Sequence, residues 1–300
     1  MKSFPNPKIN IGLNILKRRD DGFHDIETVF IPLTKDFGYD GDLYDTLEIT
    51  PRTDGRTTLK ISWADSLPGT NVIHGTDGIY GKPMSCGTEG TPGMDKPTNN
   101  DDFSENGWPK DKDLCIKAYN ELAAHYPLTG ADISLTKRIP TGAGLGGGSA
   151  DAAFTLKMLN ELFSLGLDDE RLAIHASHLG SDVPFFIYNR PMFASGRGEI
   201  LTPISCPILS GRKIGVVTPG IAVPTAEAYS GVKPAMPETG LRELISSLPL
   251  EQWKGRIAND FEKSIFKKHP ALGAIKASLY EAGAVYASMS GSGSALYGIF

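Results

Sequence analysis

The chain has 300 residues, enough for two ordinary domains with hydrophobic cores. Hydrophobic residues make up 40% and charged residues 22%, as in globular proteins, and no apolar run approaches the ~20 residues of a membrane span. The net charge of −5 argues against general nucleic-acid binding. Three scattered cysteines without metal-ligand spacing, and a beginning without an apolar run, favour a reduced, cytoplasmic protein.

A β-hairpin is expected over residues 8–33. Apolar residues alternate along its first arm and are expected on one face: Ile9, Ile11, Leu13 and Ile15. Lys8 and Asn10 fall on the opposite face, where an exposed lysine on an edge strand is the ordinary interpretation. The turn comes at Asp21-Gly22, and two aromatic residues follow it directly, Phe23 and His24.

A polar stretch over about residues 66–112 is rich in Gly, Pro, Asn and Asp and has no periodicity. It predicts a long surface loop before the helix expected in "DLCIKAYNELAAHY". Two roles stay open for this stretch. It is either a passive insertion, since loop-closure entropy grows slowly with length, or a lid over a ligand site.

Glycines are concentrated in "IPTGAGLGGGSADAA", residues 139–153, between a strand expected in "ADISLTKRIP" and a helix expected in "SADAAFTLKMLNELF". A glycine N–H can approach a bulky anion closely, and a helix N-terminus adds unpaired N–H groups and a positive dipole end. The loop therefore predicts a phosphate site, with Ser149 as the helix N-cap and Asp151 near the positive end of the helix.

Two other phosphate-binding loops fit this segment poorly. A Walker loop would end in Gly-Lys-Ser or Gly-Lys-Thr, and neither follows. Gly142, Gly144 and Gly147 satisfy GxGxxG, but a second helix follows where a dinucleotide fold requires a strand that ends in an acid. Lys137 and Arg138, just before the glycines, would supply local positive charge in an acidic chain.

That second helix is expected in "GLDDERLAIHASHLG" and contains His175 and His178. Together with Asp182 they have the appearance of a metal site, but no third ligand falls in register, so surface or helix-packing histidines are expected. Asp182 itself lies in a Gly-Ser-Asp-Val-Pro corner before an apolar, strand-like run. It is either a loop cap or a carboxylate at the edge of a site.

The chain closes with "ASMSGSGSALYGIF", a glycine- and serine-rich turn between two apolar runs. This turn is either a plain hairpin connection or a second wall of small residues that lets a ligand come close.

Taken together, these stretches resemble the GHMP kinases, a superfamily of small-molecule kinases, and within it the family of 4-diphosphocytidyl-2-C-methyl-D-erythritol kinases. The resemblance covers nearly the whole chain in order. It is carried by Pro7-Lys8-Ile9-Asn10, "DGFH", "PTGAGLGGGS", "GSDVP", "GEILTP", "TPGIAVPT" and "MSGSGS". Phe23 stands where this family more often has tyrosine, which keeps stacking but removes a hydroxyl.

The resemblance implies an α+β, two-domain GHMP kinase fold. Residues 1–193 would form the ATP-binding N-terminal domain, of the ribosomal-protein-S5 domain 2-like type and carrying the inserted polar loop. Residues 194–300 would form a ferredoxin-like, substrate-binding C-terminal domain, with the active site between the two. Because the adenine pocket of the family lies near residues 66–112, a lid there would cover ATP.

For function, the resemblance implies transfer of the γ-phosphoryl group of ATP to the 2-hydroxyl of diphosphocytidyl methylerythritol, in the non-mevalonate route to isoprenoids. Asp182 would be the base and Lys8 its electrostatic partner. Magnesium would bridge the phosphates, with no protein ligand assigned. ATP would be bound by Lys137 and by Pro140, Thr141, Gly142, Ala143, Gly144, Leu145, Gly146, Gly147, Gly148, Ser149 and Ala150. The cytidyl substrate would be bound by Asn10, Phe23, His24 and Thr225.

Two other functions stay open. A homoserine or mevalonate kinase of the same superfamily would share the glycine loop but has no need of Phe23 and His24. A non-catalytic nucleotide-binding homologue need not keep Lys8 together with Asp182. The expected partners are ATP and a small-molecule substrate, without nucleic acid or membrane, and the sequence carries no signal for oligomeric state.

Overall fold

The computed structural model describes residues 1–64, the backbone of residues 72–74, and residues 112–300. Within these residues, helices and strands are mixed and the strands form three four-stranded sheets, as expected for the α+β class. The strands are β1 (Lys2–Ser3), β2 (Lys8–Arg18), β3 (His24–Pro32), β4 (Thr46–Pro51), β5 (Thr57–Trp63), β6 (Val72–His74), β7 (Ala131–Lys137), β8 (Met192–Ser195), β9 (Ile200–Pro203), β10 (Ile214–Thr218), β11 (Tyr286–Met289) and β12 (Leu296–Ile299). The helices are α1 (Leu114–Ala123), α2 (Gly147–Leu162), α3 (Asp169–Leu179), α4 (Val183–Tyr188), α5 (Thr225–Ser230), α6 (Leu241–Ser247), α7 (Glu262–Lys268) and α8 (Pro270–Glu281), with 3-10 turns η1 (Lys35–Phe37), η3 (Pro207–Leu209) and η4 (Leu250–Gln252).

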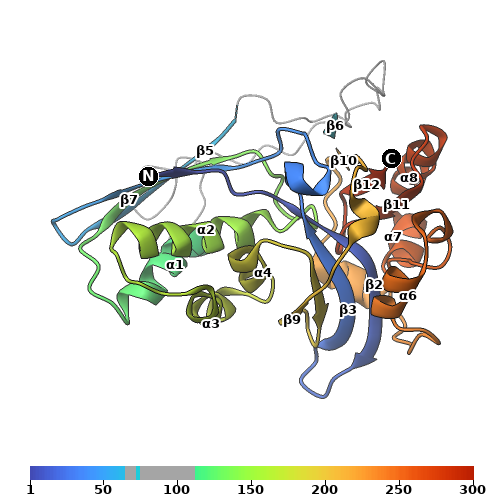
Figure 1. Ribbon diagram of the computed structural model, residues 1–300, viewed down its shortest axis with the longest axis horizontal. Helices are drawn as coiled ribbons and strands as arrows, with labels where there is room; N and C mark the ends of the chain where they lie inside the picture. Colours follow the sequence, from blue (N-terminus) through green and yellow to red (C-terminus); the bar gives the residue numbers. More distant parts are fainter. Residues whose placement is uncertain (65–71, 75–111) are drawn as a thin grey trace.

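The N-terminal sheet has the strand order β1-β4-β7-β5, in which β5 and β7 run parallel and the other neighbours antiparallel. Helices α1 to α4 lie on one side of this sheet (Figure 1). Apolar side chains of the strands pack against the helices in one core, among them Leu47, Ile133, Leu156 and Leu159. The strand and the helix expected on either side of the glycine loop are confirmed as β7 and α2.

The start of α2 differs from the prediction. The sequence predicts Ser149 as the N-cap, but the helix already begins at Gly147, and its N-cap is Gly146 with no capping side chain. Gly146 has a left-handed φ of 74°, which turns the chain into the helix before Ser149 is reached. A Cβ on Gly146 would also lie 2.9 Å from the ring of Phe186 and 3.2 Å from the stem of Lys8. Only glycine lets β2, the loop and α4 converge there.

The expected hairpin is confirmed as β2 and β3, which begin the central sheet β2-β3-β8-β9. Gly12, with φ of 62°, lies in a bulge that shifts the register between Ile11 and Leu13. Because one extra residue reverses the faces of the side chains that follow, Ile9 and Ile11 join one core and Leu13 and Ile15 another. The prediction that all four share one face is therefore wrong.

The first half of β2 is buried on both faces although it is the outer strand of its sheet. The glycine loop covers it from one side, and elements of the C-terminal half cover it from the other. Only 4% of the Lys8 side chain is exposed, so the interpretation of Lys8 as a solvent-exposed edge lysine is wrong. The burial of β2 depends on which elements pack against it. The alternation of apolar and polar residues along the strand carries no information about that packing.

The second predicted helix is confirmed as α3, but the strand-like run after Asp182 is helix α4. Pro184 fits in its first turn, and Val183 to Ile187 are all buried. A short apolar run that is buried on every side has no periodicity to separate helix from strand, which explains the error.

The C-terminal sheet has the order β11-β12-β10-β6 and is antiparallel throughout. Helix α8 packs on β11 and β12. Strand β6 belongs to the polar stretch expected to be a surface loop, and it pairs with β10. Except for β6 and Lys112, that stretch lies outside the described residues, as does Cys86. The thiols of Cys115 and Cys206 are free.

The central sheet connects the two halves of the molecule. The predicted domain boundary between residues 193 and 194 lies inside β8, which pairs with β3 on one side and β9 on the other. Side chains from β2 and β10 share a core, for example Ile9 and Val216. The division of the chain there stays a prediction.

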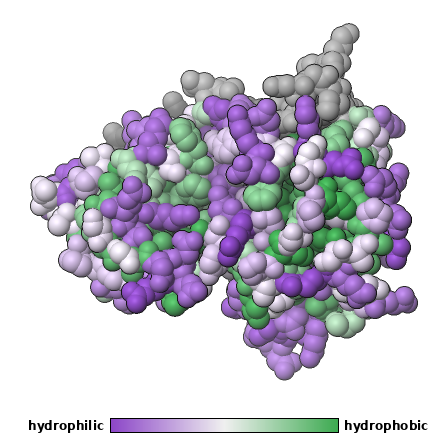
Figure 2. Space-filling view, in the orientation of Figure 1, coloured by the Kyte–Doolittle hydropathy of each residue, from purple (hydrophilic) through white to green (hydrophobic). Residues whose placement is uncertain are grey.

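On the face drawn in Figure 2, hydrophilic residues separate two hydrophobic areas, one in each half. No helix of the described chain has both the length and the hydropathy needed to cross a bilayer.

Candidate active site

A lysine and an aspartate meet where β2 approaches the start of α4. Nζ of Lys8 lies 3.4 Å from Oδ2 of Asp182, the residue that precedes α4. Lys8 also donates a hydrogen bond to Oδ1 of Asn10, and its ammonium lies 4.7 Å from the centre of the Phe30 ring. Lys8 and Asp182 are far apart in the sequence, and the fold brings them together.

The exposure of the two groups differs sharply. About a third of the Asp182 side chain, 35%, is exposed, and it makes no capping hydrogen bond to α4, which favours the site interpretation over the loop cap. Burial lowers the pKa of Lys8, and the nearby charge of Asp182 opposes this shift without cancelling it. The arrangement presents a carboxylate toward solvent and places a compensating cation behind it.

The glycine loop runs directly beside this pair. The N–H of Lys8 donates to the carbonyl of Leu145 at 2.9 Å, which ties the loop to β2. The side chains of Ala143, Leu145 and Ala150 are buried, so only their backbone groups are available to a ligand. At Gly142, by contrast, a Cβ would have no atom of the described chain within 4 Å apart from those of Gly142 and its two chain neighbours. The loop thus has an anchored side and an open side.

Beneath the loop lies a buried charge cluster that the sequence did not predict. The Lys137 ammonium donates to carboxylate oxygens of Asp45 and Asp151, and Asp45 also accepts from the backbone N–H of Arg138 and Ile139. Asp45 thereby holds the chain where β7 ends and the loop begins. Asp151, on α2, is connected to it through the same ammonium.

The cluster has one cation for two buried carboxylates. Burial alone would lower the pKa of Lys137, but Asp151 and Asp45 outweigh it and raise the pKa above its usual value. Burial raises the pKa of Asp151 to about 8, with the charge of Asp45 adding to the shift and Lys137 opposing it. Oδ1 of Asp151 finds no hydrogen-bond partner in the described chain. Lys137 is thus committed to carboxylates, and its contact with a nucleotide stays a prediction.

The terminal glycine-serine turn packs against the glycine loop. Oγ of Ser290 donates to the carbonyl of Gly144 at 2.8 Å, and the N–H of Ala295 donates to the carbonyl of Ala143 at 3.0 Å. A Cβ on Gly144 would lie 2.0 Å from the Ser290 carbonyl oxygen. The turn is therefore more than a hairpin connection, because it forms a second small-residue wall beside the loop.

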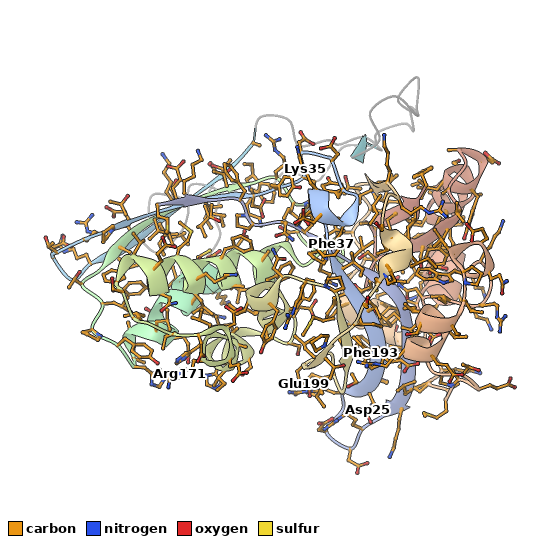
Figure 3. The ribbon with its side chains drawn as sticks, in the orientation of Figure 1. Asp25, Lys35, Phe37, Arg171, Phe193 and Glu199 are labelled. Atoms are coloured by element: carbon orange, nitrogen blue, oxygen red, sulfur yellow. The ribbon has the colours of Figure 1, made fainter. Side chains whose placement is uncertain are left out.

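Aromatic side chains gather at the other end of β3. His24 stacks on Tyr229 of α5, with ring centroids 5.0 Å apart and an interplanar angle of 23°. Phe23 is 54% exposed, and the Arg197 guanidinium lies 5.0 Å from the centre of its ring. Figure 3 shows Asp25 of β3 and Glu199 of the β8–β9 turn at this same end of the central sheet.

The remaining predicted substrate residues lie in different surroundings. The amide of Asn10 is buried and bonded to Lys8 and to Oγ1 of Thr28, so it holds the lysine in place. Thr225 lies next to the terminal turn, with its Oγ1 3.4 Å from Oγ of Ser292. Both therefore border the same region as the glycine loop.

Sequence reasoning missed several side chains of this region, namely Asp45, Arg197, Tyr229, Ser290 and Ser292. Tyr229 had a usable signal, because it closely follows the "TPGIAVPT" segment that the resemblance had already singled out. Asp45 had none, since its contacts lie about ninety residues away along the chain.

Comparison with known proteins decides which family this site belongs to. Residues 113–190 match the GHMP kinases N terminal domain, and residues 233–300 match the GHMP kinases C terminal domain. Over its whole length the chain is 43% identical to the 4-diphosphocytidyl-2-C-methyl-D-erythritol kinase of Bacteroides thetaiotaomicron, covering 92% of that protein. The chain belongs to the 4-diphosphocytidyl-2-C-methyl-D-erythritol kinase family.

Other members of this kinase family agree. A Porphyromonas gingivalis relative of the same name is 39% identical over 99% of this chain and 91% of its own length. A crystal structure of 4-(cytidine 5'-diphospho)-2C-methyl-D-erythritol kinase superposes with a TM-score of 0.66 at 29% identity, covering 100% of this chain and 90% of that one. Methanococcus jannaschii mevalonate kinase, at 17% identity and a TM-score of 0.57 over 100% of this chain and 90% of its own, shares the fold. The resemblance to GHMP kinases and the α+β fold are confirmed.

Proposed function

We propose that this kinase transfers the γ-phosphoryl group of ATP to the 2-hydroxyl of 4-diphosphocytidyl-2-C-methyl-D-erythritol, in the supply of isoprenoid precursors. The observation that carries the proposal is the Lys8–Asp182 pair, 3.4 Å apart beside an open glycine loop. Relatives that carry this name over nearly their full length support the substrate.

In the proposed step, the substrate hydroxyl oxygen forms a bond to the γ-phosphorus while its proton passes to the Asp182 carboxylate. The bond from the γ-phosphorus to the β–γ bridging oxygen breaks, and ADP leaves. Asp182 suits this role because its carboxylate is partly exposed and is not used as a helix cap. Lys8 stabilises the ionised carboxylate before the transfer and the negative charge of the transferring group during it.

The glycine loop would hold the triphosphate through backbone N–H groups on its open side, between the end of β7 and the start of α2. Lys137 acts beneath the loop in this proposal, because its ammonium is bonded to Asp45 and Asp151. Magnesium would arrive with ATP as part of the substrate. Mg²⁺ keeps several waters and needs few protein ligands, which is compatible with a partly exposed carboxylate such as Asp182 near the loop.

The cytidyl end would bind at the aromatic group at the start of β3. A cytosine ring would stack against this aromatic group, in which Phe23 is exposed and His24 stacks on Tyr229, and hydrogen bonds from His24 to the edge of the base would select it. Burial, and to a smaller extent the charge of Asp182, raise the pKa of Tyr229.

The test is a phosphorylation assay of the full chain with MgATP and three acceptors: diphosphocytidyl methylerythritol, homoserine and mevalonate. We expect turnover of the cytidyl acceptor and little or none of the other two. Preferred turnover of homoserine or mevalonate would refute the proposed substrate and leave a GHMP kinase of another specificity. No turnover of any acceptor, with ATP binding retained, would favour a non-catalytic homologue.

A further inference from the structure

A cluster of metal-ligating side chains lies on the N-terminal helices, apart from the proposed active site. Nδ1 of His175 and Nδ1 of His178, both on α3, each lie 2.9 Å from Oε1 of Glu121 on α1. The ligand atoms of these three residues all lie within 4.8 Å of one another. Figure 3 shows α3, marked by Arg171, well separated from the end of the central sheet that Asp25 marks.

The third ligand that sequence register did not supply therefore comes from another helix. His175 and His178 are one turn apart on α3 and face the same carboxylate. Glu121 and His175 are mostly shielded, with 17% and 12% of their side chains exposed, while His178 is 57% exposed. The cluster thus opens to solvent on one side, which leaves an entry path for an ion.

The chemistry of the donors fits a zinc-class ion. Two imidazole nitrogens and a carboxylate oxygen are a common set for Zn²⁺, with bonds of about 2.0–2.2 Å and a free fourth position. Tetrahedral bonds of that length separate the ligand atoms by about 3.3 Å. The two nitrogen–oxygen separations of 2.9 Å therefore need to widen by only a few tenths of an ångström.

The surroundings also satisfy the second nitrogen of the buried imidazole. Nε2 of His175 lies 3.3 Å from the hydroxyl of Tyr126. In the metal-free tautomer that carries its proton on Nδ1, Nδ1–H donates to Glu121 and the tyrosine hydroxyl donates to Nε2. With a metal on Nδ1, the proton moves to Nε2 and the tyrosine oxygen accepts it. A hydrogen bond of this kind commonly orients a metal-bound histidine. His125, whose Nε2 lies 3.7 Å from Oε1 of Glu121, or a water would complete the coordination.

We propose that Glu121, His175 and His178 form a binding site for a divalent zinc-class metal ion that links α1 to α3. The proposal is independent of the kinase reaction, because among the described residues no hydrogen bond or ion pair joins the three ligands to the glycine loop, Lys8 or Asp182. An ion there would stabilise the packing of the two helices by binding only the folded state.

The experiment uses the full chain prepared without a polyhistidine tag and stripped with a chelator. Equilibrium dialysis against Zn²⁺, followed by elemental analysis, gives the bound metal, and Co²⁺ absorption reports its coordination. We compare the unmodified chain with Glu121→Gln and with His178→Ala. The His178 side chain is 57% exposed, so its removal should leave the protein folded. His269→Ala is the matched control, because it removes another histidine that lies 3.3 Å from a glutamate, Glu227, on a different part of the chain.

We expect one tightly held Zn²⁺ in the unmodified chain and in His269→Ala, and at least a tenfold weaker affinity in both site variants. Zn²⁺ should raise the melting temperature only where it binds, and Co²⁺ should give the intense visible bands of a four-coordinate site. Zinc retained equally by Glu121→Gln and His178→Ala would overturn the proposal, as would an unmodified chain that holds less than one equivalent.

Discussion

At the residue scale, Asp182 and Lys8 differ in their exposure to water, and this difference suits the separate roles of proton acceptor and stabilising cation. The ammonium is held by Asn10 and lies over the Phe30 ring, whereas the carboxylate is partly open to solvent. A carboxylate that must take a proton from a bound hydroxyl needs access, and the cation that stabilises it does not. Burial of Lys8 also means that a shorter neutral residue there would leave both a cavity and an unpaired carboxylate.

Asp182→Asn keeps the shape of the side chain and removes its capacity to accept a proton. We expect kcat to fall by roughly 10²–10⁴-fold with the KM for ATP little changed, because the amide cannot act as a general base. Asp169→Asn, which removes an equal charge from an exposed position of α3, is the control and should keep normal kcat. Steady-state kinetics with both substrates measures the difference. A near-normal kcat for Asp182→Asn would mean that this carboxylate only shapes its loop.

At the element scale, the strand and helix on either side of the glycine loop are joined by the cluster of Asp45, Lys137 and Asp151. A buried pair of carboxylates with one cation is electrostatically unbalanced, so one of them holds a proton at higher pH than usual. Asp151 on α2 is the carboxylate that holds this proton. The free energy of unfolding of the chain therefore depends on pH through Asp151.

Burial raises the pKa of Asp151 in the folded chain to about 8, well above its ordinary value of 3.8. Between these values the folded state binds more protons than the unfolded state, so the free energy of unfolding falls as pH rises from about 4 to about 8. Asp151→Asn removes this titration. We expect the melting temperature of the unmodified chain to fall from pH 6 to pH 8 by several degrees more than that of Asp151→Asn.

The control for this measurement is Asp132→Asn, a carboxylate-to-amide change in β7. Hydrogen bonds from Thr58 and Arg52 hold the pKa of Asp132 below its usual value, so it does not titrate between pH 6 and 8. It should keep the slope of the unmodified chain. Equal slopes in all three proteins would show that Asp151 is already ionised at pH 6.

What the sequence could and could not predict at this scale follows from the range of the interactions. The glycine loop, β7 and α2 were readable because periodicity and glycine content are local. The N-cap was not predictable because Phe186 and Lys8, which come from distant segments, lie so close to Gly146 that only glycine fits there. The bulge at Gly12 reversed a face that simple alternation had assigned. Glu121 was missing from the histidine cluster because it comes from a helix 54 residues away.

At the scale of the whole molecule, the two halves are joined by backbone contact of small residues as well as by the central sheet. The glycine loop of the N-terminal half meets the terminal turn of the C-terminal half through Gly144 and Ser290. The hydroxyl of Tyr297 further donates to the carbonyl of Asn10 at 2.8 Å. Motifs that lie far apart in the sequence are thus brought into contact, because the glycine loop lies next to both Lys8 and the terminal turn.

The contact between the halves can be tested with two glycines of the same loop. Gly144 and Gly142 have nearly equal left-handed φ angles, 76° and 72°, so alanine at either position brings about 1–2 kcal/mol of backbone strain. Among the described residues, the Cβ added at Gly144 would lie 2.0 Å from the carbonyl oxygen of Ser290, whereas the one at Gly142 would meet no group beyond its chain neighbours. We therefore expect Gly142→Ala to lower the melting temperature by a few degrees and Gly144→Ala to lower it by at least twice as much. Calorimetry should also show weaker ATP binding in Gly144→Ala, because the loop must move away from the terminal turn. If the two variants melt together, the strain at the loop alone explains both, and the terminal turn does not hold the halves in register.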